Sequence, residues 1–290
     1  MGACGAIMSS PFPTFSSDLL QTQPGLAIVR MASLLATEDG KLDDDTLDAM
    51  YDQVMRGALA DVAPAKLWPE LQQGLMGHAP SRMIAALRAA HALPVVLPEV
   101  AALFGIPQLN DDQTGVDIGI HVLNTLAEAA ACHASLEVRF ALLVMNVGKF
   151  DSPPEHLPVH YRHIERAIPR INHICDRFGV PDACRELALL ALSECERVHR
   201  VSEVRAGPVA AMLERLGAFD NPMQFSQLMV VCTCDYRAYG DRSGHPYPKQ
   251  VLLELARDAC ARIEPDSVHD DLQMARATAI AAAFNSMRWS

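Results

Sequence analysis

Several polar side chains in this sequence have types and spacings that could do chemistry. Arg162, Arg166 and Arg170 recur every four residues, so on a helix they form one positive stripe that could meet phosphate. The alternative is a solvated helix face that is balanced by nearby acidic residues. His160 and His163 are three residues apart, so they can share a helix face, and next to a polar, Pro-rich loop they could equally contact solvent. The arginine stripe indicates phosphate binding, with an ordinary polar surface as the alternative.

The eight cysteines form no zinc-binding motif. No two are spaced as Cys-x-x-Cys, and Cys232 and Cys234 point to different faces of a helix because they are two residues apart. We therefore expect free buried thiols in a reducing compartment, and a cytoplasmic protein. We expect no cofactor, with a bound divalent metal ion as the alternative.

Helices must position these residues, because apolar side chains recur at spacings of three and four and rarely alternate. Proline or glycine separates the periodic segments. The pattern predicts an all-α, multi-helical protein of about a dozen helices. Residues 1–22 are rich in Ser, Pro and Thr and are predicted to be disordered. The acidic run Asp43–Asp45 predicts a helix N-terminus with a solvated cap.

Composition limits the class of protein. The chain has 290 residues, half of them hydrophobic, which is too many for a disordered protein. No apolar run approaches the ~18–20 residues that a membrane span needs, so we expect no membrane partner. Its 24 Lys and Arg against 35 Asp and Glu give a formal charge of −11. That balance argues against a surface coated with basic patches for nucleic acid.

The stretch from Asp117 to Lys149 carries a resemblance to a known family. It reads Asp-Ile-Gly-Ile-His at 117–121 and Val-Arg-Phe-Ala-Leu-Leu-Val-Met-Asn-Val-Gly-Lys at 138–149. It resembles the HD domain of one branch of bacterial CCA-adding enzymes, the tRNA nucleotidyltransferases. Further landmarks of this family are matched in order at residues 63–70, 93–105, 234–237 and 247–248. The resemblance runs from Pro24 to the C-terminus.

The resemblance implies a helical chain without the family's polymerising head. It implies a neck- and body-like region at residues 23–108, a degenerate HD-like region at 109–200 and tail-like helices at 201–290. The head carries a Gly-rich turn and two metal-holding carboxylates. This sequence has no Gly-Gly pair, and its only Asp-x-Asp is the run Asp43–Asp45, which shows no strand pattern. We therefore expect no nucleotidyl transfer.

The resemblance also implies a metal site whose central ligands are changed. The family's HD domain binds divalent metal through His residues, an adjacent His-Asp pair and a final Asp. Met145 and Asn146 stand at the adjacent pair, and Cys195 stands at another His position. Met is a poor ligand for hard cations, and Asn is neutral. Ligand-type side chains remain at His121, His160, His163, His199 and Asp235.

Structural roles are the alternatives for these retained residues. His121 lies at the edge of a helical stripe and could be a packing histidine. His199 follows Glu194, Glu196 and Arg197, which indicate an exposed helix end. For Asp235 we favour an ion pair with Arg237. The residual hypothesis is a softer or weaker metal site that uses the remaining imidazoles together with Cys195.

RNA contacts are implied by the resemblance at few positions. Arg30 keeps an arginine of the neck, and Lys66 follows Ala65 where the family has a nucleotide-selecting Glu-Arg pair. The RNA-binding candidates are Arg30, Lys66, Arg162, Arg166 and Arg170.

The functional expectation is a non-polymerising relative of tRNA nucleotidyltransferase that acts as a catalytically inactive helical binding or scaffolding protein. One alternative is a metal-dependent phosphohydrolase acting on 2′,3′-cyclic nucleotides or phosphomonoesters. The other is a module that binds tRNA without catalysis. The candidate partners are tRNA or another protein, and a homodimer is a further option.

Overall fold

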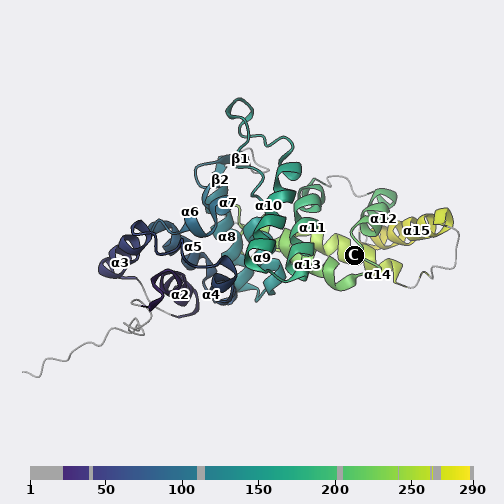
Figure 1. Ribbon diagram of the computed structural model, residues 1–290. Coiled ribbons are helices and arrows are strands. Elements are labelled where there is room, and N and C mark those ends of the chain that lie inside the picture. The colour runs from purple at the N-terminus through teal and green to yellow at the C-terminus, as the bar shows by residue number, and fades with distance from the viewer. Residues whose placement is uncertain are drawn as a thin grey trace, which may run out of the picture. The chain divides into compact units, whose positions relative to one another are not determined.

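A computed structural model describes residues 22–38, 42–109, 115–200, 205–240, 242–261, 263 and 269–287. Residues 1–21 of the predicted disordered N-terminus lie outside this range. The all-α prediction is confirmed, because the described residues form fourteen α-helices, a short 3₁₀ helix η1 (Pro154–His156) and one two-stranded antiparallel sheet (Figure 1). None of the described helices is both long and apolar enough to cross a membrane.

The chain divides into two compact units, Met1–Val96 and Leu97–Ser290. The first contains α2 (Pro24–Thr37), α3 (Asp44–Met55), α4 (Pro64–Met76), α5 (Pro80–Ala89) and α6 (Leu93–Val96). Helix α2 is the centre of this unit, since most of its side chains are buried and it packs against α3, α4 and α5. The predicted cap is confirmed, because the Asp43 carboxylate accepts a hydrogen bond of 2.7 Å from the Thr46 amide at the start of α3.

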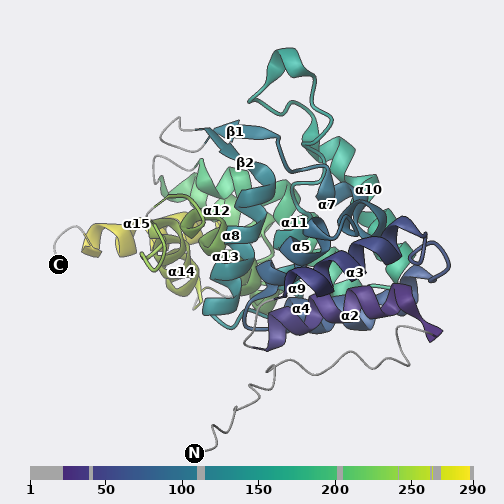
Figure 2. The same ribbon diagram turned by 90° about the vertical axis from the view of Figure 1, so that its left-hand side faces the viewer.

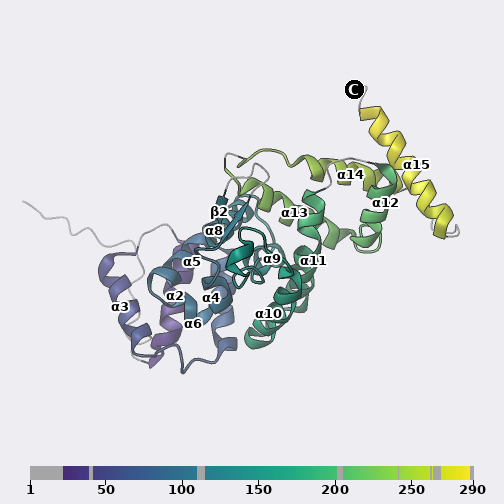
Figure 3. The same cartoon turned by 90° about the horizontal axis from the view of Figure 1, so that it is seen from above.

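The second unit is built around a buried helix, α9 (Leu136–Val144), in which every residue from Val138 to Val144 is buried. Helix α9 packs against α8 (Ile118–Ala131), α11 (Asp182–His199) and α13 (Pro222–Arg237) (Figure 1). The unit begins with α7 (Pro98–Ala101), and α10 (His163–Phe178) packs on α11. A separate group contains α12 (Ala206–Arg215), α14 (Pro248–Cys260) and α15 (His269–Met287), which pack on one another (Figure 3).

A short hairpin fixes the start of α8. Strands β1 (Pro107–Leu109) and β2 (Gly115–Asp117) pair with Pro107 opposite Asp117, and β2 leads directly into the helix (Figure 2). The Asp117 carboxylate caps α8 by accepting a hydrogen bond of 2.9 Å from the Ile120 amide, and it also accepts one of 2.5 Å from the Gly105 amide, which lies before β1. His121 is therefore held in the first turn of a firmly anchored helix.

The boundaries that the resemblance implies for the neck-, HD- and tail-like regions stay predictions.

Candidate functional site

A pocket of about 750 Å³, lined by both polar and apolar side chains, lies in the second unit. Its described lining comes from the turn after α9, the segment that leads into α10, and helices α11 and α13. It brings together residues that are far apart in the sequence: Met145, Asn146, His160, His163, Cys195, His199 and Asp235. His121 joins this group through a direct contact with Asp235. All of the predicted metal-site positions therefore meet in one place.

Asp235 is the hub of the site. Its Oδ1 lies 2.8 Å from His121 Nε2 and its Oδ2 lies 3.0 Å from His199 Nε2, and the residue is 8% exposed. Burial alone would raise the pKa of Asp235, but the two imidazoles outweigh it and hold that pKa well below its usual range. The predicted ion pair with Arg237 is wrong, because Arg237 Nε instead donates to the carbonyl of His245 at 2.7 Å.

Two tyrosines orient these imidazoles. The His121 ring stacks on Tyr239 with centroids 4.2 Å apart. The Tyr247 hydroxyl lies 2.8 Å from His199 Nδ1, on the far side of the ring from Asp235. Partners of this kind fix which ring nitrogen faces the site, as they do around metal-binding histidines. Sequence reasoning missed Tyr239, although its spacing of four residues from Asp235 was a usable signal.

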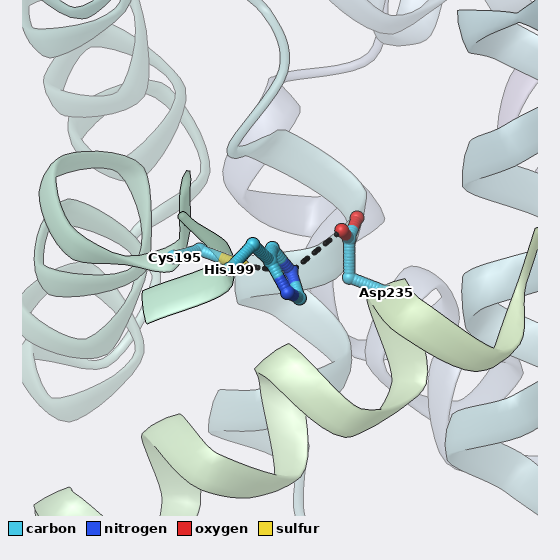
Figure 4. A group of neighbouring side chains, drawn as sticks. All are labelled: Cys195, His199 and Asp235. Atoms are coloured by element: carbon cyan, nitrogen blue, oxygen red, sulfur yellow. Dashed lines mark hydrogen bonds and ion pairs between the residues drawn. The ribbon is translucent and has the colours of Figure 1, made fainter. Parts of the chain in front are cut away.

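Three donor groups of this cluster converge closely enough to hold one metal ion. Cys195 Sγ, His199 Nε2 and an Asp235 oxygen all lie within 4.8 Å of one another (Figure 4). A thiolate, an imidazole and a carboxylate suit a single Zn²⁺ with one open position. A hydrogen bond with Cys232 and burial raise the pKa of Cys195, so its proton would have to leave when metal binds.

Met145 and Asn146 stand where the resemblance implies the central metal ligands, but their side chains do not suit a hard divalent cation. Met145 and Asn146 are 6% and 5% exposed and line the pocket, where they offer a thioether and a neutral amide. The donor set therefore suits one softer ion and lacks the charge that a site for Mg²⁺ or Mn²⁺ requires.

His160 and His163 have protein partners of their own. His160 Nδ1 lies 2.8 Å from the Ser152 hydroxyl and its Nε2 donates to the Pro107 carbonyl at 3.0 Å. His163 Nδ1 donates to the His160 carbonyl at 2.8 Å. Burial, and then the Lys149 ammonium, lower the pKa of both histidines, which favours neutral rings. The two rings line the pocket but stand outside the group of Cys195, His199 and Asp235.

Two of the three arginines of the predicted stripe, Arg166 and Arg170, lie on α10 and contact the protein itself, whereas Arg162 precedes the helix as its N-cap. Arg166 donates to the Gly148 carbonyl and the Ser152 hydroxyl, at 3.0 and 2.9 Å. Arg170 donates to the Val147 carbonyl at 3.0 Å and forms an ion pair with Asp151. These two arginines therefore hold the loop 147–152 against α10.

Arg162 differs from its two neighbours on the stripe, because its side chain is exposed and pairs only locally with Glu165. In the first unit, Arg30 forms hydrogen bonds of 2.9 and 2.5 Å with the buried Glu70 carboxylate. The hydrogen bonds to Glu70 raise the pKa of Arg30. Lys66 is exposed on α4. Of the five predicted RNA-binding residues, Arg30, Lys66 and Arg162 are thus exposed, but Arg30 and Arg162 are each paired with a glutamate.

Replacing Arg170 with Gln should lower the free energy of unfolding by about 1.5 kcal/mol, because it breaks charged hydrogen bonds to Val147 and Asp151. Arg162→Gln, at the N-cap that precedes the same helix, is the matched control, and its exposed pair should contribute nothing measurable. Urea denaturation of both variants measures the difference. Equal stabilities would contradict the role that we assign to Arg170.

A pH-dependent stability is expected from His199. Burial alone would lower its pKa, but Cys195 and the Asp235 carboxylate outweigh it and raise the pKa of His199 well above its usual value. The resulting stabilisation is complete below pH ~6.5 and is lost as the pH rises through the raised pKa. With EDTA present, the free energy of unfolding should fall above pH ~6.5 by at most about 1.4 kcal/mol per pH unit.

His199→Gln should remove this decline, whereas the same change at the exposed His156 should leave it intact. Urea denaturation between pH 6 and 9 provides the measurement. An unchanged slope in the His199 variant would show that another group titrates.

Curated relatives of the chain are found by comparing its sequence with those of known proteins. No protein-family profile matches the chain. The multifunctional CCA protein of Paracidovorax citrulli is 36% identical over 253 residues, covering 87% of this chain and 60% of the relative. Those of Burkholderia cenocepacia and Cupriavidus taiwanensis are 37% and 36% identical, over 84% and 87% of this chain and 58% and 61% of the relatives. The chain spans about 60% of the length of the relatives that it matches. It is therefore homologous to the bacterial multifunctional CCA proteins.

Proposed function

We propose that this chain is a catalytically inactive helical binding or scaffolding protein, in which the pocket of an HD-like site persists without its metal centre. One observation carries the proposal. Met145 and Asn146 stand side by side in the pocket wall at the positions where the resemblance implies an adjacent His-Asp pair. Neither side chain can supply the charge that metal-assisted phosphoester hydrolysis requires.

The other carboxylates of the described lining do not replace the missing charge. Glu196 pairs with Lys149 and Arg200, at 3.2 and 3.0 Å, and Glu165 pairs with Arg162. Asp235 is already bonded to two imidazoles. The pocket can therefore receive a polar ligand, but it offers no cluster of free carboxylates for a pair of hard cations.

Two activity assays on the purified chain test the proposal. Incubated with tRNA that lacks its 3′-terminal CCA and with labelled CTP and ATP, the chain should incorporate no label. With phosphomonoesters and Mg²⁺, Mn²⁺ or Ni²⁺, it should release no phosphate above a protein-free control. Activity in either assay would overturn the proposal.

A second candidate function is a phosphohydrolase with a single softer metal ion. The convergence of Cys195, His199 and Asp235 within 4.8 Å favours it. This candidate predicts one Zn²⁺ per chain, measured by metal analysis after exposure to zinc and desalting. The metal should be lost in Cys195→Ser and kept in Cys175→Ser, a change at another buried cysteine. A chain without stoichiometric zinc would exclude the candidate.

The partner that we propose to test first is tRNA, since the homologous proteins are called multifunctional CCA proteins. The exposed cations Lys66 and Arg162 are the residues that we expect to contact phosphate. Filter binding at low and moderate salt should show affinity that weakens with salt and falls further in Lys66→Gln and Arg162→Gln. Unchanged binding in both variants would direct the search to a protein partner.

A further inference from the structure

Two cysteines outside the pocket lie close enough to react with each other. Cys132 ends α8 as its C-terminal cap and Cys234 lies within α13, yet their sulfur atoms are only 3.9 Å apart. A disulfide requires about 2.05 Å, so the two sulfurs must approach by about 2 Å. One of them sits at a helix end, where the backbone can yield more readily than inside a helix.

The two thiols differ in access to solvent. Of the cysteines that the structure describes, Cys132 is the exposed one, while Cys175, Cys184, Cys195, Cys232, Cys234 and Cys260 are buried. A reagent in solution can therefore reach Cys132 first, and Cys234 is the neighbouring thiol that can resolve the product. This division between an attacking and a resolving cysteine is typical of reversible thiol switches.

The groups around Cys132 favour its thiolate form. Hydrogen bonding with the Cys234 thiol lowers the pKa of Cys132 to about 6, in spite of partial burial. The guanidinium groups of Arg139 and Arg237 are near enough to act on this thiol electrostatically. Nearby cations and hydrogen-bond donors are the features that mark reactive cysteines.

We propose that Cys132 and Cys234 form a redox-sensitive dithiol site that small-molecule disulfides of the glutathione type oxidise to an intramolecular disulfide. The Cys132 thiolate attacks one sulfur of glutathione disulfide, forming a mixed disulfide and releasing one glutathione thiolate. The Cys234 sulfur then attacks Cys132, and the second glutathione leaves. The chain loses two electrons and two protons, and one glutathione disulfide becomes two glutathione thiols.

The disulfide would join the two helices that carry the centre of the pocket. Helix α8 holds His121 and α13 holds Asp235, which directly follows Cys234. The cross-link does not depend on whether the pocket binds metal or acts as an enzyme.

Peptide mapping of the full chain tests the proposal. The reduced protein is incubated with glutathione disulfide, quenched by alkylation, digested without reduction and analysed by mass spectrometry. We expect a linked pair of peptides containing Cys132 and Cys234 in most chains, with two glutathione thiols released per chain.

The controls are variants at the exposed and at a buried position. Cys132→Ser removes the sulfur that reacts first, so Cys234 should carry neither glutathione nor a link to another cysteine, while Cys175→Ser should form the link as the wild type does. A stable glutathione adduct on Cys132 without the link, or links that mainly join other cysteines, would overturn the proposal. The Cys132 variant keeps the test decisive, since a change at this exposed residue spares the core.

Discussion

Replacing Asp235 with Asn is expected to lower the free energy of unfolding by about 3 kcal/mol at pH 6. The carboxylate is almost fully buried and is bonded to His121 and to His199, so its loss leaves two imidazoles around a neutral amide. The pKa of Asp235 lies below its usual value, which means that its stabilisation is present above pH ~4 and is lost only in stronger acid. The comparison at pH 6 therefore captures the full contribution.

Urea denaturation with EDTA present measures this effect without interference from metal. Asp258→Asn is the matched control, because that carboxylate is 66% exposed and pairs only with its neighbour Arg257. The control should behave as the wild type does. A loss in Asp235→Asn no larger than in the control would show that Asp235 is not the hub of the site.

The second prediction with a large expected effect concerns metal affinity at Met145 and Asn146, where the resemblance implies an adjacent His-Asp pair. The double substitution Met145→His and Asn146→Asp should raise the affinity for Mn²⁺ by about 100-fold or more. It adds an imidazole and a carboxylate to a pocket that already contains His199 and Asp235. Isothermal titration calorimetry of the wild type and the double variant measures the gain.

Combining the double substitution with Asp235→Asn is the control, and it should remove most of the gain. An affinity for Mn²⁺ that does not change with the double substitution would show that these positions do not face a metal site. Wild-type binding as tight as that of the variant would show that Met145 and Asn146 do not weaken metal binding.

The helices could be predicted from sequence because apolar spacings of three and four are a local property of each segment. The hairpin of β1 and β2 could not, since strands of three residues are too short for a period of two to appear. The Asp43 cap was predictable because the residue types that cap helices are few.

The sequence could predict which residues lie together at the candidate site, but it was a poorer guide to the hydrogen bonds and ion pairs that they form. The resemblance indicated His121, His199 and Asp235, and these residues do meet. The expected pairing of Asp235 with Arg237 fails because residues two apart on a helix point to different faces. Helical spacing placed Arg166 and Arg170 on one face, but it could not show that the loop 147–152 covers that face.

The central claim, which we propose, is that the pocket contains no catalytically active metal centre. The most direct test is hydrolysis of 2′,3′-cyclic AMP by the wild-type chain in the presence of Mg²⁺, Mn²⁺, Ni²⁺ or Zn²⁺. We predict a rate that cannot be distinguished from that of protein-free buffer with the same ion. Metal-dependent turnover by the wild type that disappears in His121→Ala would contradict the claim.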